Sequence, residues 1–582
     1  MEKTNLRTTL CANVELTKEK VSVCGWVNSI RDHGGILFID LRDYSGLVQV
    51  VADPKNLKNF KEIESLRRED CIKAVGTVRE RAKDLVNKKL KTGHLEIVLQ
   101  DFEIFSKSDI LPFEIDDKAS ISEDFRLKYR YLDLRRPLMQ KRIRQRSNAM
   151  QNARKYLTQK EEFAEIETPF LIRSTPEGAR DYVVPSRVNK HKFYALPQSP
   201  QLYKQLLMVG GFDRYFQFVK CFRDEDLRSD RQPEFTQLDL ELSFIEKEDV
   251  FRIVENLLKE FGEVYNIKIP SKVPRMSFKE AMEKYSIDKP DTRFELFTYD
   301  VTDLASKSEF GVFLNTIKDG GIVKCINPEK DFSRNELDRY IENAKQFGAK
   351  GMAWVKVKQG EFEGNISKFI QKDVQKQIIE KIGAKENSTI MFIADKKATC
   401  LDVIGRLRLK VGDDLDLIDK TKYNFLWVVD FPLFEETEDG SLTPSHHMFT
   451  MPQKEHIKLL DENPGEVLAE QYDLVLNGFE LAGGSIRCHR KDVQKKIMNI
   501  IGFPEEKAKE RFGFLLEAFE FGVPPHGGIA FGFDRVCALM SGTNDIREVM
   551  TFPKNKKAQC TMDGSPSDIQ KDQLDELHIK LK

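Results

Sequence analysis

The sequence lacks the features of several protein classes. Its nine cysteines form no CxxC pair, which argues against a zinc ribbon or a dense disulfide framework and favours a reducing cytosol. No apolar run comes near the roughly 20 residues that a membrane-spanning helix needs, and Met1 to Lys20 contain no signal-peptide core. The 93 Lys and Arg against 94 Asp and Glu leave a formal charge of -1, which excludes a globally basic wrapper of nucleic acid.

The length and the apolar content predict a chain of several domains. At roughly 100 to 200 residues per domain, the chain is long enough for about three to five, and 40 Phe among 40% hydrophobic residues can fill several cores. We expect a β-rich domain at 1–110, a linker at 111–137, and a chemistry-rich domain in two parts, 138–294 and 421–582. The segment between them, 295–420, predicts an inserted α+β domain, because GAKGMAW (348 to 354) indicates a turn leading into a strand.

Five short β-rich runs between Val21 and about Phe105 fit a small closed barrel of the OB type. A basic run lies between the fourth and fifth strands, and it is either a solvated loop or an edge that faces phosphates; it contains Arg79, Arg81, Lys83, Lys88, Lys89 and Lys91. Phe38 and Gln49 fall on adjacent strands. Phe38 either packs in the core or stacks on an unpaired base, a contact that gives about 1 to 3 kcal/mol.

A strongly basic segment follows the linker. Between Arg126 and Lys155, Asp133 is the one acid among many Arg and Lys residues, and apolar residues recur at helical spacing. This pattern predicts an amphipathic helix with a cationic face, which would offer a path to a nucleic-acid backbone.

Three segments of the split domain carry chemistry together. FAEIETPF (163 to 170) predicts an edge strand that Pro169 closes. FRDEDLRSDRQPEFTQLDLEL (222 to 242) predicts a hairpin that offers a cation to a phosphate, a carboxylate to an amine and a ring to a base. In GGIAFGFDR (527 to 535), Gly532 permits close backbone approach, and Arg535 can stack on a purine with about 0.5 to 2 kcal/mol.

These three segments resemble motifs 1, 2 and 3 of the class II aminoacyl-tRNA synthetases. Together with STPEGARDYVVPSR, QSPQLYKQLLM, GFELAGGSIR and VPPHGGIAFGFDR, they make the whole chain similar to the bacterial-type aspartyl-tRNA synthetases. The resemblance implies an α+β multi-domain fold: an N-terminal OB-type anticodon-binding barrel, a class II catalytic domain with an antiparallel sheet, and a GAD-like inserted domain. It also implies a cytoplasmic homodimer.

The resemblance implies a two-step reaction, in which ATP activates L-aspartate to an adenylate and the aspartyl group then passes to the 3' end of tRNA(Asp); it leaves tRNA(Asn) open as a second acceptor. Both steps need positioning and charge neutralisation more than a protein nucleophile. By position in the motifs, Arg223 and Arg535 are the expected catalytic residues. Asp473 and Glu480 are expected to hold Mg²⁺, a hard cation that prefers oxygen ligands.

The resemblance also implies the binding residues. Those for aspartate are Glu177, Ser199, Gln201, Lys204, Arg223, Asp239, His446 and Arg487. Those for ATP are Arg223, Asp224, Glu225, Gln232, Phe235, Glu480, Gly532, Phe533, Asp534 and Arg535. Arg31, Phe38 and Gln49 would contact the anticodon, which favours base stacking for Phe38, while His33 and Arg81 lie where tRNA discrimination could be tuned.

Lysyl- and asparaginyl-tRNA synthetases share the barrel and the motifs, so they are competing interpretations, as is a non-catalytic RNA-binding paralogue. Lys204 and Arg487 favour an acidic amino acid, because neutral asparagine would leave a buried Arg unpaired and lysine would be repelled. Arg223, Glu480 and Arg535 argue against a chain that has lost activation.

Overall fold

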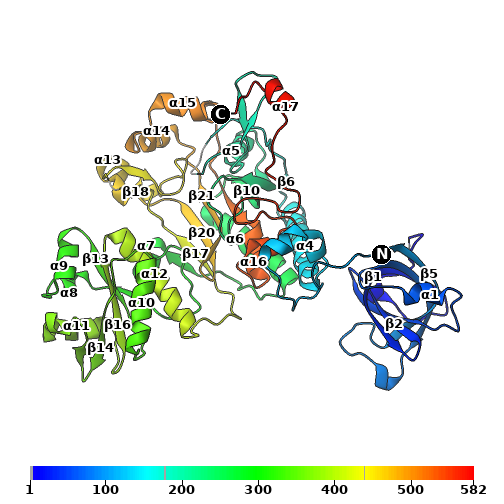
Figure 1. Cartoon of the computed structure of the whole chain (residues 1–582). Helices are drawn as coiled ribbons and strands as arrows, with labels where there is room; N and C mark the ends of the chain where they lie inside the picture. The colour runs from blue at the N-terminus through cyan, green and yellow to red at the C-terminus, as the bar shows by residue number, and fades with distance from the viewer. Residues whose placement is uncertain (1–3, 176–178, 438, 582) are drawn as a thin grey trace. The chain divides into compact units, whose positions relative to one another are not determined.

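The computed structural model describes residues 4–175, 179–437 and 439–581. The chain divides into two compact units, one of residues 1–126 and 131–140 and the other of residues 127–130 and 141–582. Figure 1 shows the elements of both. Within the described ranges, no helix combines the length and the apolar character needed to cross a membrane.

The first unit contains a closed five-stranded barrel, which confirms the OB-type prediction. Its strands pair in the order β1-β2-β3-β5-β4 and are β1 (Val21–His33), β2 (Ile36–Asp43), β3 (Gly46–Ala52), β4 (Cys71–Glu80) and β5 (Leu95–Ser106). Alternation builds the core: along β4, Ile72, Ala74, Gly76 and Val78 are buried, while every second residue from Cys71 to Thr77 is partly exposed. The short helix η1 (Cys11–Asn13) precedes the first strand, α1 (Phe60–Glu64) connects β3 to β4, and η2 (Lys83–Leu85) lies between β4 and β5.

The second unit is built on an 8-stranded sheet in the order β11-β17-β20-β21-β22-β10-β9-β6. Its strands are β6 (Ala164–Glu165), β9 (Arg214–Phe222), β10 (Glu234–Ser243), β11 (Arg275–Ser277), β17 (Phe425–Val429), β20 (Gln471–Leu476), β21 (Phe479–Ile486) and β22 (His526–Gly532). All neighbours are antiparallel except the edge pairs β11 with β17 and β6 with β9. The edge strand expected over 163 to 170 is confirmed only as the two-residue β6.

One face of this sheet packs on helices, and that packing leaves the other face for chemistry. Leu238, Leu240 and Leu242 of β10 share one core with residues of α4 (Pro137–Gln159), α6 (Lys247–Tyr265) and α16 (Phe533–Met540). The alternate residues of β10 must therefore face away from this core.

The segment predicted as an insertion has its own 5-stranded sheet, in the order β12-β13-β16-β14-β15. Its strands are β12 (Thr298–Asp300), β13 (Ile322–Ile326), β14 (Ala353–Lys358), β15 (Glu361–Glu363) and β16 (Thr389–Asp395). Figure 1 shows α10 (Arg334–Gln346) and α12 (Lys397–Asp414) on one face of it, and α8 (Thr302–Ala305), α9 (Gly311–Lys318) and α11 (Lys372–Ile382) on the other. Each face has its own apolar core.

Shorter elements complete the second unit and its connections. They are α2 (Glu123–Lys128), α3 (Arg130–Asp133), β7 (Val183–Pro185), β8 (Phe193–Ala195), α5 (Gln201–Val209), α7 (Phe278–Tyr285), η3 (Ser367–Phe369), β18 (Phe434–Glu436), β19 (Leu442–Pro444), η4 (Lys454–His456), α13 (Leu459–Glu462), η5 (Pro464–Glu466), α14 (Lys491–Ile500), α15 (Glu505–Ala518), η6 (Phe519–Phe521), η7 (Ile546–Glu548) and α17 (Lys571–Glu576).

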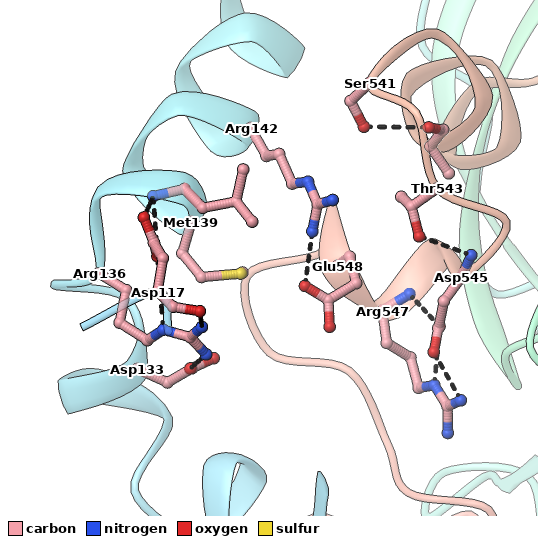
Figure 2. A network of polar contacts seen from close by, with 12 residues as sticks. Asp117, Asp133, Arg136, Met139, Arg142, Ser541, Thr543, Asp545, Arg547 and Glu548 are labelled. Atoms are coloured by element: carbon pink, nitrogen blue, oxygen red, sulfur yellow. Dashed lines mark hydrogen bonds and ion pairs between the residues drawn. The ribbon is translucent and has the colours of Figure 1, made fainter. Parts of the chain in front are cut away.

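The basic segment forms helices as expected, but its arginines do not form a cationic face. Figure 2 shows Arg142 reaching Glu548 at 2.7 Å, and Arg136 reaching Asp133. Arg146 lies 2.5 Å from Asp534, and buried Arg130 donates to the carbonyl oxygens of residues 547, 550 and 551. The prediction is wrong for these four residues, because they face carboxylates or backbone carbonyls of the protein itself and are not presented to solvent as a cationic surface.

Candidate active site

A cavity of about 470 Å³ opens on the face of the large sheet away from the helical core. It is lined by β10, β21 and β22, by α5, and by the loops around residues 230 and 446. The structure brings together here most residues predicted for aspartate and ATP, namely Ser199, Gln201, Lys204, Arg223, Glu225, Gln232, Phe235, Asp239, His446, Glu480, Arg487, Gly532, Asp534 and Arg535.

Strand alternation explains how β10 and β22 build the cavity floor. Phe235, Asp239 and Glu241 lie two residues or a multiple of two apart on β10, opposite the face that carries the buried leucines. Across the ladder, Asp239 pairs with Ala530 and Glu241 with Gly528. A Cβ atom at Gly528 would lie 2.1 Å from the Glu241 Oε2 atom and 2.0 Å from the Leu240 carbonyl oxygen, so only glycine fits beside this carboxylate.

Helical spacing explains how α5 adds a wall. Gln201, Lys204, Gln205 and Met208 recur at intervals of three and four, and the last three of them are buried. The helix therefore presents an ammonium group and two amides to the floor that β10 provides.

Two cations and two carboxylates form a buried cluster at one end of the cavity. The Lys204 Nζ atom lies 2.6 Å from the Asp239 Oδ1 atom and 3.1 Å from the Glu241 Oε2 atom. Arg487 donates from Nε and Nη2 to the two oxygens of Glu241, at 2.9 and 3.2 Å, and from Nη1 to the Ser485 hydroxyl. At most 3% of each of the four side chains is exposed.

The pKa values of the two carboxyls in this cluster shift in opposite directions. Burial alone would raise the pKa of Glu241, but the charges of Arg487 and Lys204 outweigh it and hold the pKa at about 2. Burial raises the pKa of Asp239, although Lys204 opposes it. His446 lines the same end of the cavity, where desolvation and the nearby charges of Arg487 and Lys204 lower its pKa to about 4. A neutral His446 adds no charge to the cluster.

Aromatic and arginine side chains gather at the other end. The Arg223 guanidinium lies 5.1 Å from the centre of the Phe235 ring, and Arg535 donates to the carbonyl oxygen of Glu480 at 2.6 Å. Among the residues that the structure describes, the buried Nε atoms of both arginines have no hydrogen-bond partner. An aromatic ring and guanidinium planes in one cavity suit a purine, which can stack on both, and the unused donors suit an oxygen-rich ligand.

Contacts to neighbouring loops and helices hold the other cavity side chains that are predicted to bind ATP. Glu225 pairs with Arg231 at 2.9 Å. Gln232 exchanges two hydrogen bonds with the backbone of Lys554. Asp534 is held by Arg146 and by the backbone N–H of Thr236.

Asp473 and Glu480 suit a hard cation. A Cβ atom at Gly483 would lie 2.9 Å from the Asp473 Oδ1 atom and 3.3 Å from the Glu480 Oε1 atom, so both oxygens converge above this glycine. Burial and the neighbouring charge of Glu480 raise the pKa of Asp473 well above its ordinary range. A divalent cation with oxygen ligands would relieve this repulsion.

Some predicted residues do not line the cavity. Phe533 is buried in the core of the sheet, 5.0 Å from the Phe218 ring. Asp224 forms a backbone bridge with Arg180, and Asp473 lies on β20 next to the lining residues. Glu177 lies outside the described residues.

The barrel carries a second set of predicted residues. The Arg31 guanidinium lies 2.8 Å from Asp40 and also donates to the side-chain oxygen of Gln49. Gln49 in turn donates to Glu96 at 2.8 Å. Polar side chains therefore run across β1, β2, β3 and β5 on one face of the barrel.

An aromatic pair lies on the same strands. Phe38 is half-buried, with its ring edge-on to that of exposed His33 at 5.6 Å. The Arg81 side chain is 5% exposed, and burial lowers its pKa. Its Nε atom donates to the carbonyl oxygen of Leu95. Phe38 and His33 are thus accessible to a ligand, whereas the Arg81 side chain is almost wholly buried.

Comparison with known proteins decides the family. Residues 122–556 match the family model described as tRNA synthetases class II (D, K and N), and residues 21–105 match the OB-fold nucleic acid binding domain. A Halothermothrix orenii protein named aspartate–tRNA(Asp/Asn) ligase is 50% identical over 97% of this chain and 96% of its own length. The chain belongs to the aspartate–tRNA ligase family.

Further relatives of this ligase family agree. A Bacillus licheniformis protein named aspartate–tRNA ligase is 48% identical over 99% of both chains. Among solved structures, the asparaginyl-tRNA synthetases of Pyrococcus horikoshii and Entamoeba histolytica are 17% and 18% identical, with TM-scores of 0.56 and 0.58. They cover 92% and 94% of this chain, and 94% and 98% of their own chains. These two structures confirm the fold alone.

Sequence reasoning assigned no role to several residues that the ligase site contains. Glu241 joins Lys204 to Arg487, and Gln198, Gln237 and His447 line the cavity. For Glu241 and Gln237 the period of two along β10 was an available signal, because it places them on the same face as Asp239. Gln198 and His447 lie in loops, where spacing predicts no direction.

Proposed function

We propose that the chain activates L-aspartate with ATP and transfers the aspartyl group to the 3' end of tRNA(Asp). The observation that carries the proposal is the buried cluster of Lys204, Asp239, Glu241 and Arg487 in the same cavity as Arg223, Phe235 and Arg535. One end of the cavity suits a small dicarboxylic amino acid, and the other suits a purine nucleotide.

Arg487 explains a preference for a side-chain carboxylate. A guanidinium has five N–H donors, and the contacts to Glu241 and Ser485 use one on each nitrogen. One N–H therefore stays on each terminal nitrogen, in the fork that pairs with a carboxylate. The amide of asparagine would bring a donor to these donors, and lysine would bring a like charge.

The remaining cavity residues have proposed roles by position. Ser199, Gln201 and Asp239 bind the substrate ammonium group. Glu177, which lies outside the described residues, has the same role by resemblance to the family alone. Arg223 bridges the α-carboxylate and the α-phosphate, while Glu225, Phe235 and Arg535 bind adenine. Asp473 and Glu480 would hold Mg²⁺, which neutralises phosphate charge when it is bound.

Exchange of pyrophosphate into ATP tests the first half-reaction without tRNA. Aspartate, asparagine and lysine are compared as substrates of the full-length protein. We expect exchange with aspartate at a kcat/KM at least 100-fold above that of the other two. No exchange with any of them would revive the non-catalytic RNA-binding paralogue, and preference for another amino acid would favour the related synthetases.

We propose that the barrel binds the anticodon through Arg31, Phe38 and Gln49, and that His33 and Arg81 bear on tRNA choice. Relatives of similar identity are named with different ranges, aspartate–tRNA(Asp/Asn) ligase and aspartate–tRNA ligase. Aspartylation of purified tRNA(Asp) and tRNA(Asn) measures the range of this chain directly.

By resemblance to the family, we also propose a cytoplasmic homodimer with a GAD-like inserted domain. Exposed Phe170 and Leu171 after β6 are apolar surface that a second copy could cover. Sedimentation of the Phe170→Asp variant against the unmodified protein tests this contact, because a buried charge would shift the equilibrium towards monomer.

A further inference from the structure

A chain of hydrogen bonds runs from the backbone behind the site to the cavity wall. The His526 Nδ1 atom lies 2.9 Å from the carbonyl oxygen of Pro524, and its Nε2 atom lies 3.1 Å from the Gln205 Nε2 atom. Gln201 donates from its Nε2 atom to the Gln205 Oε1 atom at 3.1 Å. The side chains of His526 and Gln205 are wholly buried, whereas Gln201 lines the cavity.

The Pro524 carbonyl fixes the direction of the whole chain. A carbonyl oxygen only accepts, so the His526 Nδ1 atom must carry the proton. In a neutral imidazole the Nε2 atom is then an acceptor, and Gln205 must turn its NH₂ group towards it. The Gln205 oxygen consequently faces Gln201, which must donate a hydrogen bond to it from its own NH₂ group.

The last member of the chain then has one orientation. With its NH₂ group engaged by Gln205, Gln201 turns its side-chain oxygen the other way, and no described residue donates to that oxygen. Burial lowers the pKa of His526 to about 4, which keeps the imidazole neutral at physiological pH. A doubly protonated imidazole would keep the Nδ1 bond to Pro524 but would make Nε2 a donor, so both glutamine amides would have to turn over.

We propose that His526 and Gln205 are positioning residues, which hold the Gln201 amide so that its oxygen accepts a hydrogen bond from the ammonium group of the amino acid. Neither residue lines the cavity. Without them the Gln201 amide can rotate, and its NH₂ group would then face a cation. The inference rests on the proposed aspartate activation.

Aspartate and succinate separate this role from a general loss of structure, because succinate has both carboxylates but no ammonium group. In pyrophosphate exchange, the Gln205→Met variant should raise the KM for aspartate roughly tenfold, the effect of losing one hydrogen bond to a charged group. The inhibition constant of succinate and the KM for ATP should change less than twofold. The His526→Phe variant should give the same pattern.

A double-mutant cycle asks whether both residues act through Gln201. In a Gln201→Ala background, Gln205→Met should have no further effect on the KM for aspartate. Gln375→Met is the matched control, because Gln375, like Gln205, is a buried amide. It donates to backbone carbonyls in segment 295–420, away from the cavity lining. It should leave the KM for aspartate unchanged.

Two results would overturn the proposal: equal weakening of aspartate and succinate, or a full additional effect of Gln205→Met in the Gln201→Ala background. Thermal unfolding identifies any variant that fails to fold. Because variants are made at both Gln205 and His526, the test still works if one of the two variants does not fold. Absence of aspartate-dependent exchange in the unmodified protein would instead refute the proposed function.

Discussion

Replacing Arg487 by Met tests the charge argument most directly. The unbranched Met side chain replaces the aliphatic stem of Arg, so the substitution removes the guanidinium while it keeps the packing of the stem. Glu241 would lose two hydrogen bonds, at 2.9 and 3.2 Å, and would keep the Lys204 ammonium at 3.1 Å. The cluster would change from two cations and two carboxylates to one cation and two carboxylates before any substrate binds.

The expected magnitudes follow from this imbalance. Loss of one partner of a buried hydrogen-bonded charge pair costs about 2 to 5 kcal/mol in binding, which is roughly 30-fold to 5,000-fold in kcat/KM for aspartate. Breaking such a pair also destabilises a fold by about 3 to 5 kcal/mol. Because Lys204 still faces Glu241, we expect the lower end of that range in the free energy of unfolding.

Pyrophosphate exchange with aspartate and asparagine, together with urea unfolding, measures both effects. Arg293→Met is the matched control, because Arg293 also forms an ion pair, with Asp291 at 2.6 Å, and neither of these two residues lines the cavity. It should lose stability but keep the preference for aspartate. If Arg487→Met loses less than tenfold in kcat/KM and keeps its preference over asparagine, Arg487 does not bind the side-chain carboxylate.

Three further predictions concern other parts of the chain. Phe38→Ala should weaken aspartylation of tRNA by roughly 5-fold to 150-fold, the effect of about 1 to 3 kcal/mol of stacking, and should spare pyrophosphate exchange; equal loss of both would argue against base stacking. Gly528→Ala should lower the free energy of unfolding by about 1 to 3 kcal/mol or more, because its Cβ atom would lie 2.1 Å from Glu241. The control is Gly513→Ala in α15, where a Cβ atom meets open space, and it should be neutral or stabilising. A neutral Gly528→Ala would contradict the close approach. Burial lowers the pKa of His526 to about 4, so the unfolded chain binds its proton more tightly, and the protein loses stability as pH falls from 6.5 towards 4. Urea unfolding at pH 7 and pH 5 measures this loss, and His526→Phe should make it about 2 kcal/mol smaller. An unchanged pH dependence in the variant would mean that His526 is not held neutral.

The elements of the fold were largely predictable because their patterns are local. All five barrel strands follow from alternating apolar residues, and the turn at 348 to 352 leads into β14 as expected. The three motif segments take the strand and hairpin forms predicted, except that β6 is much shorter than the alternating run around it. Alternation indicates which residues can pair, but the ladder itself depends on a neighbour that lies far away in the sequence.

The contacts of the site were less predictable, because they join distant segments. Glu241 and Arg487 are 246 residues apart, and no local pattern indicates that their side chains meet. The hydrogen-bond chain from His526 to Gln205 spans 321 residues. Resemblance to the family supplied the candidate residues, whereas the partners that orient them required the three-dimensional arrangement.

A comparison of an arginine in the basic segment with Arg487 shows how a cation that can bind a ligand differs from a structural one. Arg130 lies in a segment whose charge predicted a nucleic-acid path, yet its Nε and Nη2 atoms donate to the carbonyl oxygens of residues 547, 550 and 551. Arg487 directly follows β21, and it keeps a donor on each terminal nitrogen beside a cavity. Since a guanidinium binds a ligand only through donors that the fold has not used and that face a cavity, the position of these donors predicts recognition better than the density of basic residues.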